Sequence, residues 1–462
     1  MSAALTDAAT VQPSNHTVLR ASLRVGLMFL APGMLIMALR DRPIATGWLG
    51  LVLTFGPLLV FGLLYIWVTY RGTTPGIKND GLFFNEFSSR KFGGIALGVV
   101  ITGFYVVLYW FPEYLGFIEW GKPARGLIVM LEPLSQAMRG THADQWFLYG
   151  FLYTMAVLVM GVRMFYRYRH NRYQLWRTGS VMFFQLGFAF TLPALLMMFG
   201  QPEFYFTYFW PLKYDYLFPG TVHDMISKPG GVGLFMIGWG VIASFLLTPL
   251  LTWRFGKRWY CSWVCGCGGL AETAGDPFRQ LSSKKISAWR FERWSIHLVL
   301  VFITVVTAML WIDSASEGGV FGEAAQSAKK VYGFAVGALL SGVVGVGFYP
   351  LLGSRVWCRF FCPMAAILGL FQRFFSRFRI TTNGGQCMSC GNCSTYCEMG
   401  IDVRAYAMRG ENIVRASCVG CGICAAVCPR GVLKLESGAT HKDRFAGAEH
   451  PLSDLIGAIK RG

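Results

Sequence analysis

Long apolar runs alternate with short polar segments from the N-terminal region up to residue 352. A helix that crosses a bilayer needs about 20 mostly apolar residues. Eight runs approach or exceed this length, so the pattern predicts about eight transmembrane helices. They cover roughly residues 22–39, 44–70, 94–112, 145–165, 178–200, 232–253, 294–312 and 331–352.

The first run, 22–39, also resembles the apolar core of a signal peptide. About twenty residues precede it, and the polar stretch 40–43 follows in place of a small-residue cleavage site. We therefore interpret it as a membrane anchor.

The composition agrees with a membrane protein, because 54% of the residues are hydrophobic and only 14% are charged. If the N-terminus lies inside, the inner loops hold 17 Lys and Arg and the outer loops hold 9. Positively charged loops stay in the cytoplasm. We therefore expect both termini in the cytoplasm of a bacterial inner membrane. This distribution also accounts for the net charge of +18, so nucleic acid is not an expected partner.

The apolar runs stop before Ile380, and the composition then becomes that of a soluble domain. We therefore divide the chain into an N-terminal cytoplasmic segment (1–21), helices one to five with their loops (22–231), a cysteine-bearing helical repeat (232–380), a soluble domain (381–437) and a basic tail (438–462).

The soluble domain contains two cysteine motifs, "CMSCGNCSTYCE" and "CVGCGICAAVCPRG". Both have the Cys-x2-Cys-x2-Cys-x3-Cys spacing of bacterial ferredoxins with two 4Fe–4S clusters, in which the fourth cysteine binds the other cluster. One cluster is predicted to bind Cys387, Cys390, Cys393 and Cys428. The other is predicted to bind Cys418, Cys421, Cys424 and Cys397. A small α+β two-cluster ferredoxin is expected, and a pair of zinc knuckles is the alternative.

Glu398 stands where the first motif would usually carry proline. Its charge should lower the potential of the neighbouring cluster.

A second pair of motifs, "GKRWYCSWVCGCGG" at 256–269 and "GSRVWCRFFCP" at 353–363, follows two of the apolar runs. They align at an offset of 97 residues, which indicates an internal repeat. Helical positions i and i+4 share a face, so each repeat would present two sulfurs in one direction. Four facing thiols would suit a third iron–sulfur or other metal centre, made by Cys261, Cys265, Cys358 and Cys362, with Cys267 as a further candidate.

Other interpretations of these membrane cysteines stay open. They could be buried structural cysteines, a thiol–disulfide pair or a copper site. All 13 cysteines lie between residues 261 and 428, on the predicted cytoplasmic side, where disulfides are disfavoured. The neighbouring Arg258 and Arg355 would lower the pKa of the thiols and offset the charge of a cluster.

Together these motifs resemble the NosR/NapH family of membrane polyferredoxins over residues 232–437. The resemblance implies a protein that passes electrons between the quinone pool and periplasmic reductases. It also implies that Cys261, Cys265, Cys358 and Cys362 are the membrane cysteines of the family. Two features depart from the pattern: the first repeat ends in Cys-Gly-Cys, and the first 231 residues leave no room for a large periplasmic flavin domain.

We therefore interpret the chain as an iron–sulfur electron-transfer subunit, and not a stand-alone enzyme, that connects the quinone pool or a cytoplasmic donor with a partner redox complex. A copper reductase or maturation factor and a redox-sensing or structural subunit are the alternatives. Haem is not expected, because only His297 lies inside a predicted span. Flavin is not expected either, because the fragment "SGAT" at 437–440 lacks the closing Ser or Thr of an attachment motif.

Two segments in the predicted outer loops are candidates for interaction or quinone binding. The stretch 201–220, "QPEFYFTYFWPLKYDYLFPG", is rich in aromatic residues, which indicates an interfacial belt or a docking surface for an outer partner. Glu132 lies in an apolar stretch too short to span the membrane, which suggests a re-entrant or interfacial helix and a candidate quinone-site carboxylate.

The loop charges generate a direct test of topology. A reporter that is active only in the periplasm should be silent when fused after Gly462, because the charges place this end in the cytoplasm. The same reporter fused after Glu119, in a predicted outer loop, is the active control. Strong activity at Gly462 would overturn the predicted topology.

Overall fold

A computed structural model describes residues 47–71, 75–76, 88–256, 258–375, 378–413 and 415–437, together with positions 19, 22, 23 and 26. The predicted span 22–39, apart from three of these single positions, and the predicted tail 438–462 lie outside the described residues.

Seven helices in the described part of the chain are long and apolar enough to cross a membrane, which confirms the predicted fold class. Four are continuous α-helices, and three of these are α2 (Gly47–Tyr70), α3 (Phe92–Trp110) and α6 (Gln145–Arg167). Another, α14 (Ile286–Ala315), is the longest of the seven. The remaining three contain π-helical segments and run over Arg172–Met198, Val232–Phe255 and Glu323–Gly347.

Each interrupted span is built from shorter elements. The first contains α7 (Arg172–Phe183), the π-helical η3 (Phe184–Thr191) and α8 (Leu192–Met198). The second contains α10 (Val232–Ile242), η5 (Ala243–Leu247) and α11 (Thr248–Phe255). The third contains α15 (Glu323–Tyr332) and η7 (Gly333–Gly347).

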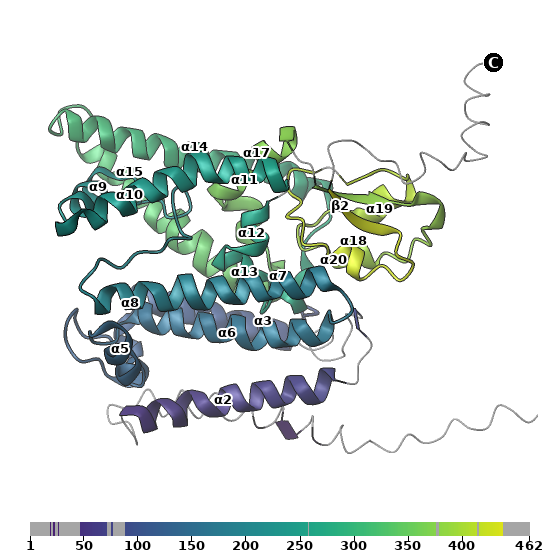
Figure 1. Ribbon diagram of the computed structural model, residues 1–462, viewed down its shortest axis with the longest axis horizontal. Helices are drawn as coiled ribbons and strands as arrows, with labels where there is room; N and C mark the ends of the chain where they lie inside the picture. The colour runs from purple at the N-terminus through teal and green to yellow at the C-terminus, as the bar shows by residue number, and fades with distance from the viewer. Residues whose placement is uncertain are drawn as a thin grey trace, which may run out of the picture.

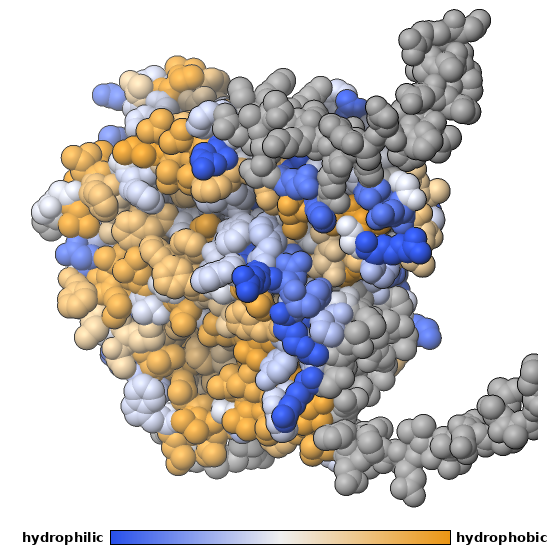
Figure 2. Space-filling view, turned by 45° about the vertical axis from the view of Figure 1, so that its right-hand side comes forward, coloured by the Kyte–Doolittle hydropathy of each residue, from blue (hydrophilic) through white to orange (hydrophobic). Residues whose placement is uncertain are grey.

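The long helices lie roughly parallel, and the C-terminal domain packs at one end of the bundle (Figure 1). Helix α2 contacts α6, α6 contacts α7, and α3 contacts η7. Hydrophobic side chains cover much of the helical body, whereas hydrophilic side chains gather mainly toward the C-terminal domain (Figure 2). This distribution is expected of a bundle that presents its sides to lipid.

The segments that follow α11 and η7 carry the cysteine repeat. After α11 come α12 (Trp259–Trp263), α13 (Gly266–Glu272) and the 3-10 turn η6 (Asp276–Leu281). After η7 come α16 (Tyr349–Leu352), the π-helical η8 (Trp357–Phe361) and α17 (Pro363–Phe375).

Within the described residues, short helices connect several of the long spans. They are η2 (Pro112–Leu115), α4 (Gly126–Val129), α5 (Glu132–Arg139), α9 (Pro219–Ile226) and η4 (Pro229–Gly231).

The aromatic stretch 201–218 packs inward, so neither an interfacial belt nor a docking surface describes most of it. Phe204, Phe209, Trp210, Tyr216 and Phe218 are all buried in the largest hydrophobic core of the protein. The sequence pattern missed this because an inward loop and an interfacial belt share the same aromatic composition.

The C-terminal domain has the predicted α+β character. Its strands β1 (Phe378–Thr382) and β2 (Leu433–Ser437) pair antiparallel, with Ile380 opposite Leu435. Between them lie a 3-10 turn, η9 (Gly384–Gln386), and three short helices, α18 (Asn392–Thr395), α19 (Val403–Met408) and α20 (Ile423–Ala426).

The aromatic stretch 201–218, which we call the inward loop, packs against α10, and this packing gives a stability prediction. A Cβ atom at Gly240 would lie 2.2 Å from ring atoms of Tyr216, so Gly240→Ala should push this ring from its place against α10. Such overpacking costs about 1–3 kcal/mol. Thermal unfolding in detergent should show a lower midpoint for this variant. Gly238→Ala, on the same helix with open space at its Cβ position, should leave the midpoint nearly unchanged. Equal midpoints for the two variants would contradict the packing.

Candidate metal centres

The first ferredoxin motif surrounds a small cavity. Its lining includes all four cysteines predicted to bind the first cluster: Cys387, Cys390, Cys393 and Cys428. Burial raises the pKa of the Cys393 thiol to about 11, and the nearby charges of the other three add to this effect. The structure therefore brings this predicted set together, although the cysteines come from opposite ends of the domain.

The second predicted set also converges. Burial raises the pKa of the Cys424 thiol well above its ordinary value, and charges on Cys421, Cys397 and Cys418 raise it further. Cys393, from the first set, also lies near Cys424, so the two groups of thiols are neighbours.

The donor chemistry fits iron–sulfur clusters. All 13 cysteines lie within the described residues, and each is a free thiol. Four thiols around one cavity are the donors that a 4Fe–4S cluster requires. Gly391 and Gly422 have φ angles of 80° and 70°, which let the motif loops turn tightly before α18 and α20.

The membrane cysteines do not lie on continuous helices, which corrects the predicted geometry. Helix α12 holds Cys261 and ends at Trp263, so Cys265 has an extended backbone and precedes α13. Likewise Cys358 lies in η8, whereas Cys362 is extended and precedes α17. Each repeat therefore contains a helix that ends between its two cysteines. The spacing of the cysteines alone could not distinguish this broken helix from an unbroken one.

Arginines of the repeat join its two halves reciprocally. Arg258 Nη1 donates to the carbonyl oxygen of Cys358 at 3.1 Å. Arg355 Nη1 donates to the carbonyl oxygen of Cys261, also at 3.1 Å. Each arginine thus reaches the first cysteine of the other repeat. This exchange is the contact pattern of two equivalent halves that face each other.

The four membrane thiols lie together in the buried interior. Burial raises the pKa of Cys261, Cys358 and Cys362, and the charges of neighbouring thiols in the group raise it further. This effect exceeds the lowering that was expected from Arg258 and Arg355. Arg355 Nη1 also lies 3.7 Å from Cys358 Sγ. The pairs therefore face one another, which is the arrangement that a shared centre needs.

Cys267 adjoins this group. A hydrogen bond with Cys267 lowers the pKa of the Cys265 thiol to about 7. The fifth thiol therefore lies beside a predicted ligand. The next residue, Gly268, allows the close approach of α13 to Cys261, because a Cβ atom there would lie 1.9 Å from the Cys261 carbonyl oxygen.

The inward loop packs against the segment that holds Cys261. Tyr260, beside Cys261, donates a hydrogen bond from its hydroxyl to the carbonyl of Thr207. Its ring also packs against Phe209, with ring centroids 5.6 Å apart. Ser244 Oγ donates to the Trp210 carbonyl at 2.6 Å, which fixes the loop to η5. The aromatic stretch is therefore part of the site that sequence reasoning missed.

A buried ion-pair network lies between the membrane thiols and the ferredoxin domain. Its seven side chains are Arg163, Arg177, Arg279, Arg355, Glu272, Asp276 and Glu398. Each of them is at most 3% exposed. Because an isolated buried charge is very unfavourable, these groups depend on one another.

Glu272 is the most heavily paired carboxylate. Arg177 and Arg355 approach its Oε1 at 2.6 and 2.7 Å, and Arg279 contacts its Oε2. Burial alone would raise the pKa of Glu272, but the three guanidinium groups hold it well below its ordinary value. Glu272 therefore stays ionised in a dry environment.

Glu398 connects the network to the ferredoxin domain. Arg279 Nη1 lies 2.7 Å from its Oε2, and Arg355 Nε lies 3.2 Å from its Oε1. Burial raises the pKa of Glu398, against the opposing effect of the two arginines. The charge of Glu398 therefore faces two guanidinium groups, and its effect on the cluster potential stays a prediction.

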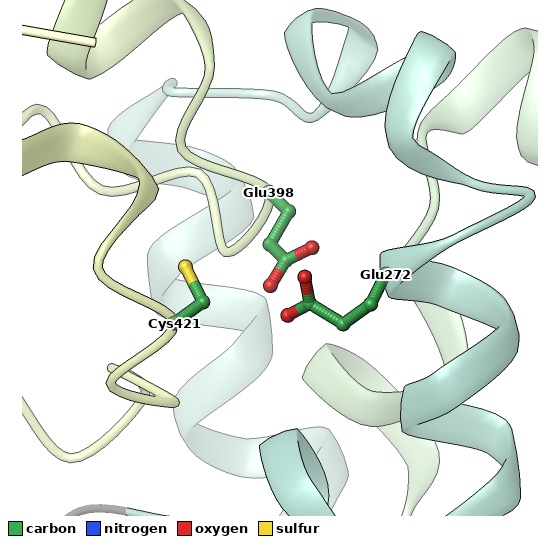
Figure 3. Close-up of side chains that lie close together, drawn as sticks. All are labelled: Glu272, Glu398 and Cys421. Atoms are coloured by element: carbon green, nitrogen blue, oxygen red, sulfur yellow. The ribbon is translucent and has the colours of Figure 1, made fainter. Parts of the chain in front are cut away.

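The carboxylates of Glu272 and Glu398 face each other, with the Cys421 sulfur beside them (Figure 3). Their candidate ligand atoms lie within 4.8 Å of one another. A cation at this point would meet the guanidinium groups that already pair with both carboxylates. We therefore interpret the cluster as part of the ion-pair network.

Hydrogen bonds fix the ferredoxin domain to the helices. Gln174 Nε2 donates to the Cys421 carbonyl at 2.6 Å, and Tyr173 Oη donates to the Gly420 carbonyl at 2.8 Å. Arg258 Nε donates to the Ala416 carbonyl at 3.1 Å. The loop that carries the second motif is thus held at the end of α7.

Glu132, the candidate quinone-site carboxylate, has local partners. It contacts His142, accepts the backbone N–H of Ala143 at 2.9 Å and accepts Gln136 Nε2 at 2.9 Å. These contacts join α5 to the start of α6, so the structure gives Glu132 a local structural role.

Comparison with known families agrees with the cysteine pattern. The family described as a 4Fe-4S dicluster domain matches residues 386–433. The family described as a 4Fe-4S binding domain matches residues 237–287 and again residues 334–381. The second family therefore covers both halves of the repeat.

Three curated relatives show similarity to part of the chain. YccM of Escherichia coli K12, named for electron transport, is 26% identical over 35% of this chain and 46% of its own. The methylamine utilization ferredoxin-type protein MauN of Methylobacillus flagellatus is 27% identical over 39% of this chain and 57% of its own. The ferredoxin-type protein NapH of E. coli K12 is 26% identical over 31% of this chain and 48% of its own length.

The chain spans about half the length of these three curated relatives. No solved structure matches the chain.

The network generates a stability prediction. Glu272→Gln should destabilise the protein by about 3–5 kcal/mol, because it leaves buried guanidinium charges uncompensated. Denaturant-induced unfolding in detergent, followed by tryptophan fluorescence, measures the change. The control is Glu119→Gln in the exposed pair with Lys122, which should cost less than about 1 kcal/mol. Equal losses for both variants would contradict the role of the network.

Proposed function

Because the chain belongs to the NosR/NapH-type membrane polyferredoxins, we propose that it carries electrons between the quinone pool or a cytoplasmic donor and a partner redox complex. The chain is an iron–sulfur electron-transfer protein of the membrane. Its proposed location is a bacterial inner membrane, with both termini in the cytoplasm. A periplasmic acceptor or other redox subunits are the proposed partners.

One observation carries the proposal: three groups of thiols adjoin one another from the ferredoxin domain into the bundle. Cys393 lies near Cys424 and connects the two ferredoxin groups. Arg355 contacts both Cys358, in the membrane group, and Glu398, which follows Cys397. A continuous series of candidate redox groups is what an electron-transfer chain requires.

The ligand sets proposed for the ferredoxin domain are the two groups of four cysteines described above. A third centre would take Cys261, Cys265, Cys358 and Cys362, with Cys267 beside it. When bound, 4Fe–4S clusters supply reversible one-electron transfer, and the protein sets their spacing and electrostatics. Arg258 and Arg355 hold the two halves together, and the buried network provides charge close to the centres.

The copper alternative rests on the pair Cys265 and Cys267, whose thiols are hydrogen-bonded. Soft thiolate ligands also suit Cu(I), so a maturation factor would hold copper at this point. Metal analysis of the purified protein distinguishes the two functions.

The ferredoxin assignment is tested by Cys390→Ser combined with Cys421→Ser. This double variant should lose most of its iron, because each substitution removes one proposed ligand of a different cluster. Iron and sulfide content measure the loss. Ser394→Ala, beside a ligand and outside the proposed sets, is the control. Iron at the wild-type level in the double variant would make the ligand assignment wrong.

The third centre is tested by Cys261→Ser combined with Cys358→Ser. If the centre is a 4Fe–4S cluster, this variant should lose about one third of the iron and keep the ferredoxin signals in electron paramagnetic resonance (EPR). Unchanged iron with a loss of copper would favour the maturation factor. Unchanged iron and copper would leave the membrane cysteines without a metal.

A further inference from the structure

A cavity of about 380 Å³ lies where two membrane helices meet the ferredoxin domain. Its walls include Tyr173, Ser180, Trp259, Trp263, Phe378 and Gly420. Small-molecule sites commonly have volumes of about 300–1,000 Å³ and mostly apolar walls. The cavity is therefore large enough for the ring of an organic ligand.

The cavity lies at the edge of the lipid-facing surface. Ser180 and Phe184 come from the apolar span Arg172–Met198, and Phe255 comes from the end of Val232–Phe255. The neighbouring side chains of Trp176 and Phe183 are strongly exposed on the first of these spans. A ligand dissolved in the bilayer would approach the cavity along this surface.

Three hydroxyl groups give the cavity its polarity. Tyr173 Oη donates to the Gly420 carbonyl at 2.8 Å, and Ser180 Oγ donates to the Trp263 carbonyl at 2.9 Å. Ser262 Oγ donates to the Val419 carbonyl at 3.0 Å. Because each proton is already donated, the oxygen lone pairs remain as acceptors. The cavity therefore favours an occupant that brings hydroxyl donors.

The walls also belong to the thiol-bearing segments. Val419 and Gly420 lie between Cys418 and Cys421, and Trp263 lies between Cys261 and Cys265. An occupant would touch the loops of two proposed redox groups at once. Because of this placement, we expect the ligand to be redox-active.

We infer that this cavity binds the head group of a membrane-soluble quinol. A quinol combines a flat apolar ring, two hydroxyl donors and a lipid-soluble tail, and each of these matches a property of the cavity. A phospholipid head group fits less well, because the described lining residues include no Lys or Arg to meet its phosphate.

The inference rests on the proposed function, because the quinol needs a one-electron acceptor. On oxidation the quinol breaks two O–H bonds and becomes a quinone. Its two electrons would pass singly to the clusters that the ferredoxin cysteines would hold, and its two protons would pass to water. The reverse reaction has the same balance.

Binding is tested on the full-length protein in detergent with a photoreactive azidoquinone. Mass spectrometry should locate the cross-links on α7 and on the segment Trp259–Val264, and excess decylubiquinone should prevent them. Ser180→Phe, which fills the cavity, should reduce labelling by about tenfold or more. The matched control is Thr304→Phe on the exposed face of α14, where Thr304 also donates to a backbone carbonyl, and its labelling should match the wild type.

A second measurement follows electron transfer. Protein reduced with dithionite should be reoxidised by decylubiquinone with a rate that saturates, and Ser180→Phe should slow this step without slowing oxidation by ferricyanide. Labelling confined to other segments, or equal labelling of Ser180→Phe and wild type, would overturn the inference. Full iron content without labelling would overturn it and leave the proposed function intact. Specific labelling without iron would support the cavity and contradict the proposed function.

Discussion

Burial of charge is the constraint on which the rest of this structure depends. Four guanidinium groups and three carboxylates meet away from water, and each would be very unfavourable there without its partners. The partners come from α6, α7, both halves of the repeat and the ferredoxin domain. Arg355 and Glu398, for example, pair only when the domain is docked. The network therefore fixes the relative position of all the candidate redox groups.

The repeat supplies the symmetry of the membrane site. Arg258 and Arg355 each reach the first cysteine of the opposite half, so the two halves close on one another. The loop at 201–218 packs against the first half of the repeat through Tyr260 and Phe209. The four membrane cysteines are buried, and the ferredoxin domain packs against the same repeat through the pair of Arg355 and Glu398. This order of elements is suited to electron transfer through the protein.

Sequence patterns predicted the elements whose signal is local. The apolar runs predicted the seven described spans, and cysteine spacing predicted the α+β ferredoxin domain. Contacts between distant segments were not accessible in the same way. Glu272, Asp276 and Arg279 lie in a predicted inner loop, where charged residues usually face solvent, and only tertiary packing shows that they are buried.

Other features were hidden for similar reasons. The spacing of Cys261 and Cys265 predicted that both lie on one face of a helix. The helix instead ends after α12, so the thiols converge although the two cysteines do not share a helix. The loop 201–218 has the composition of an interfacial belt, and its inward course depends on partners such as Tyr260. The cavity beside Ser180 is formed by segments that lie far apart in the sequence, so no sequence motif predicts it.

Iron and sulfide analysis of the purified wild-type protein, combined with EPR of the reduced state, tests the central claim most directly. Three 4Fe–4S clusters would give about twelve iron atoms and about twelve sulfides per chain, with signals from interacting clusters. Zinc in place of iron, or a protein without acid-labile sulfide, would contradict an electron-transfer role.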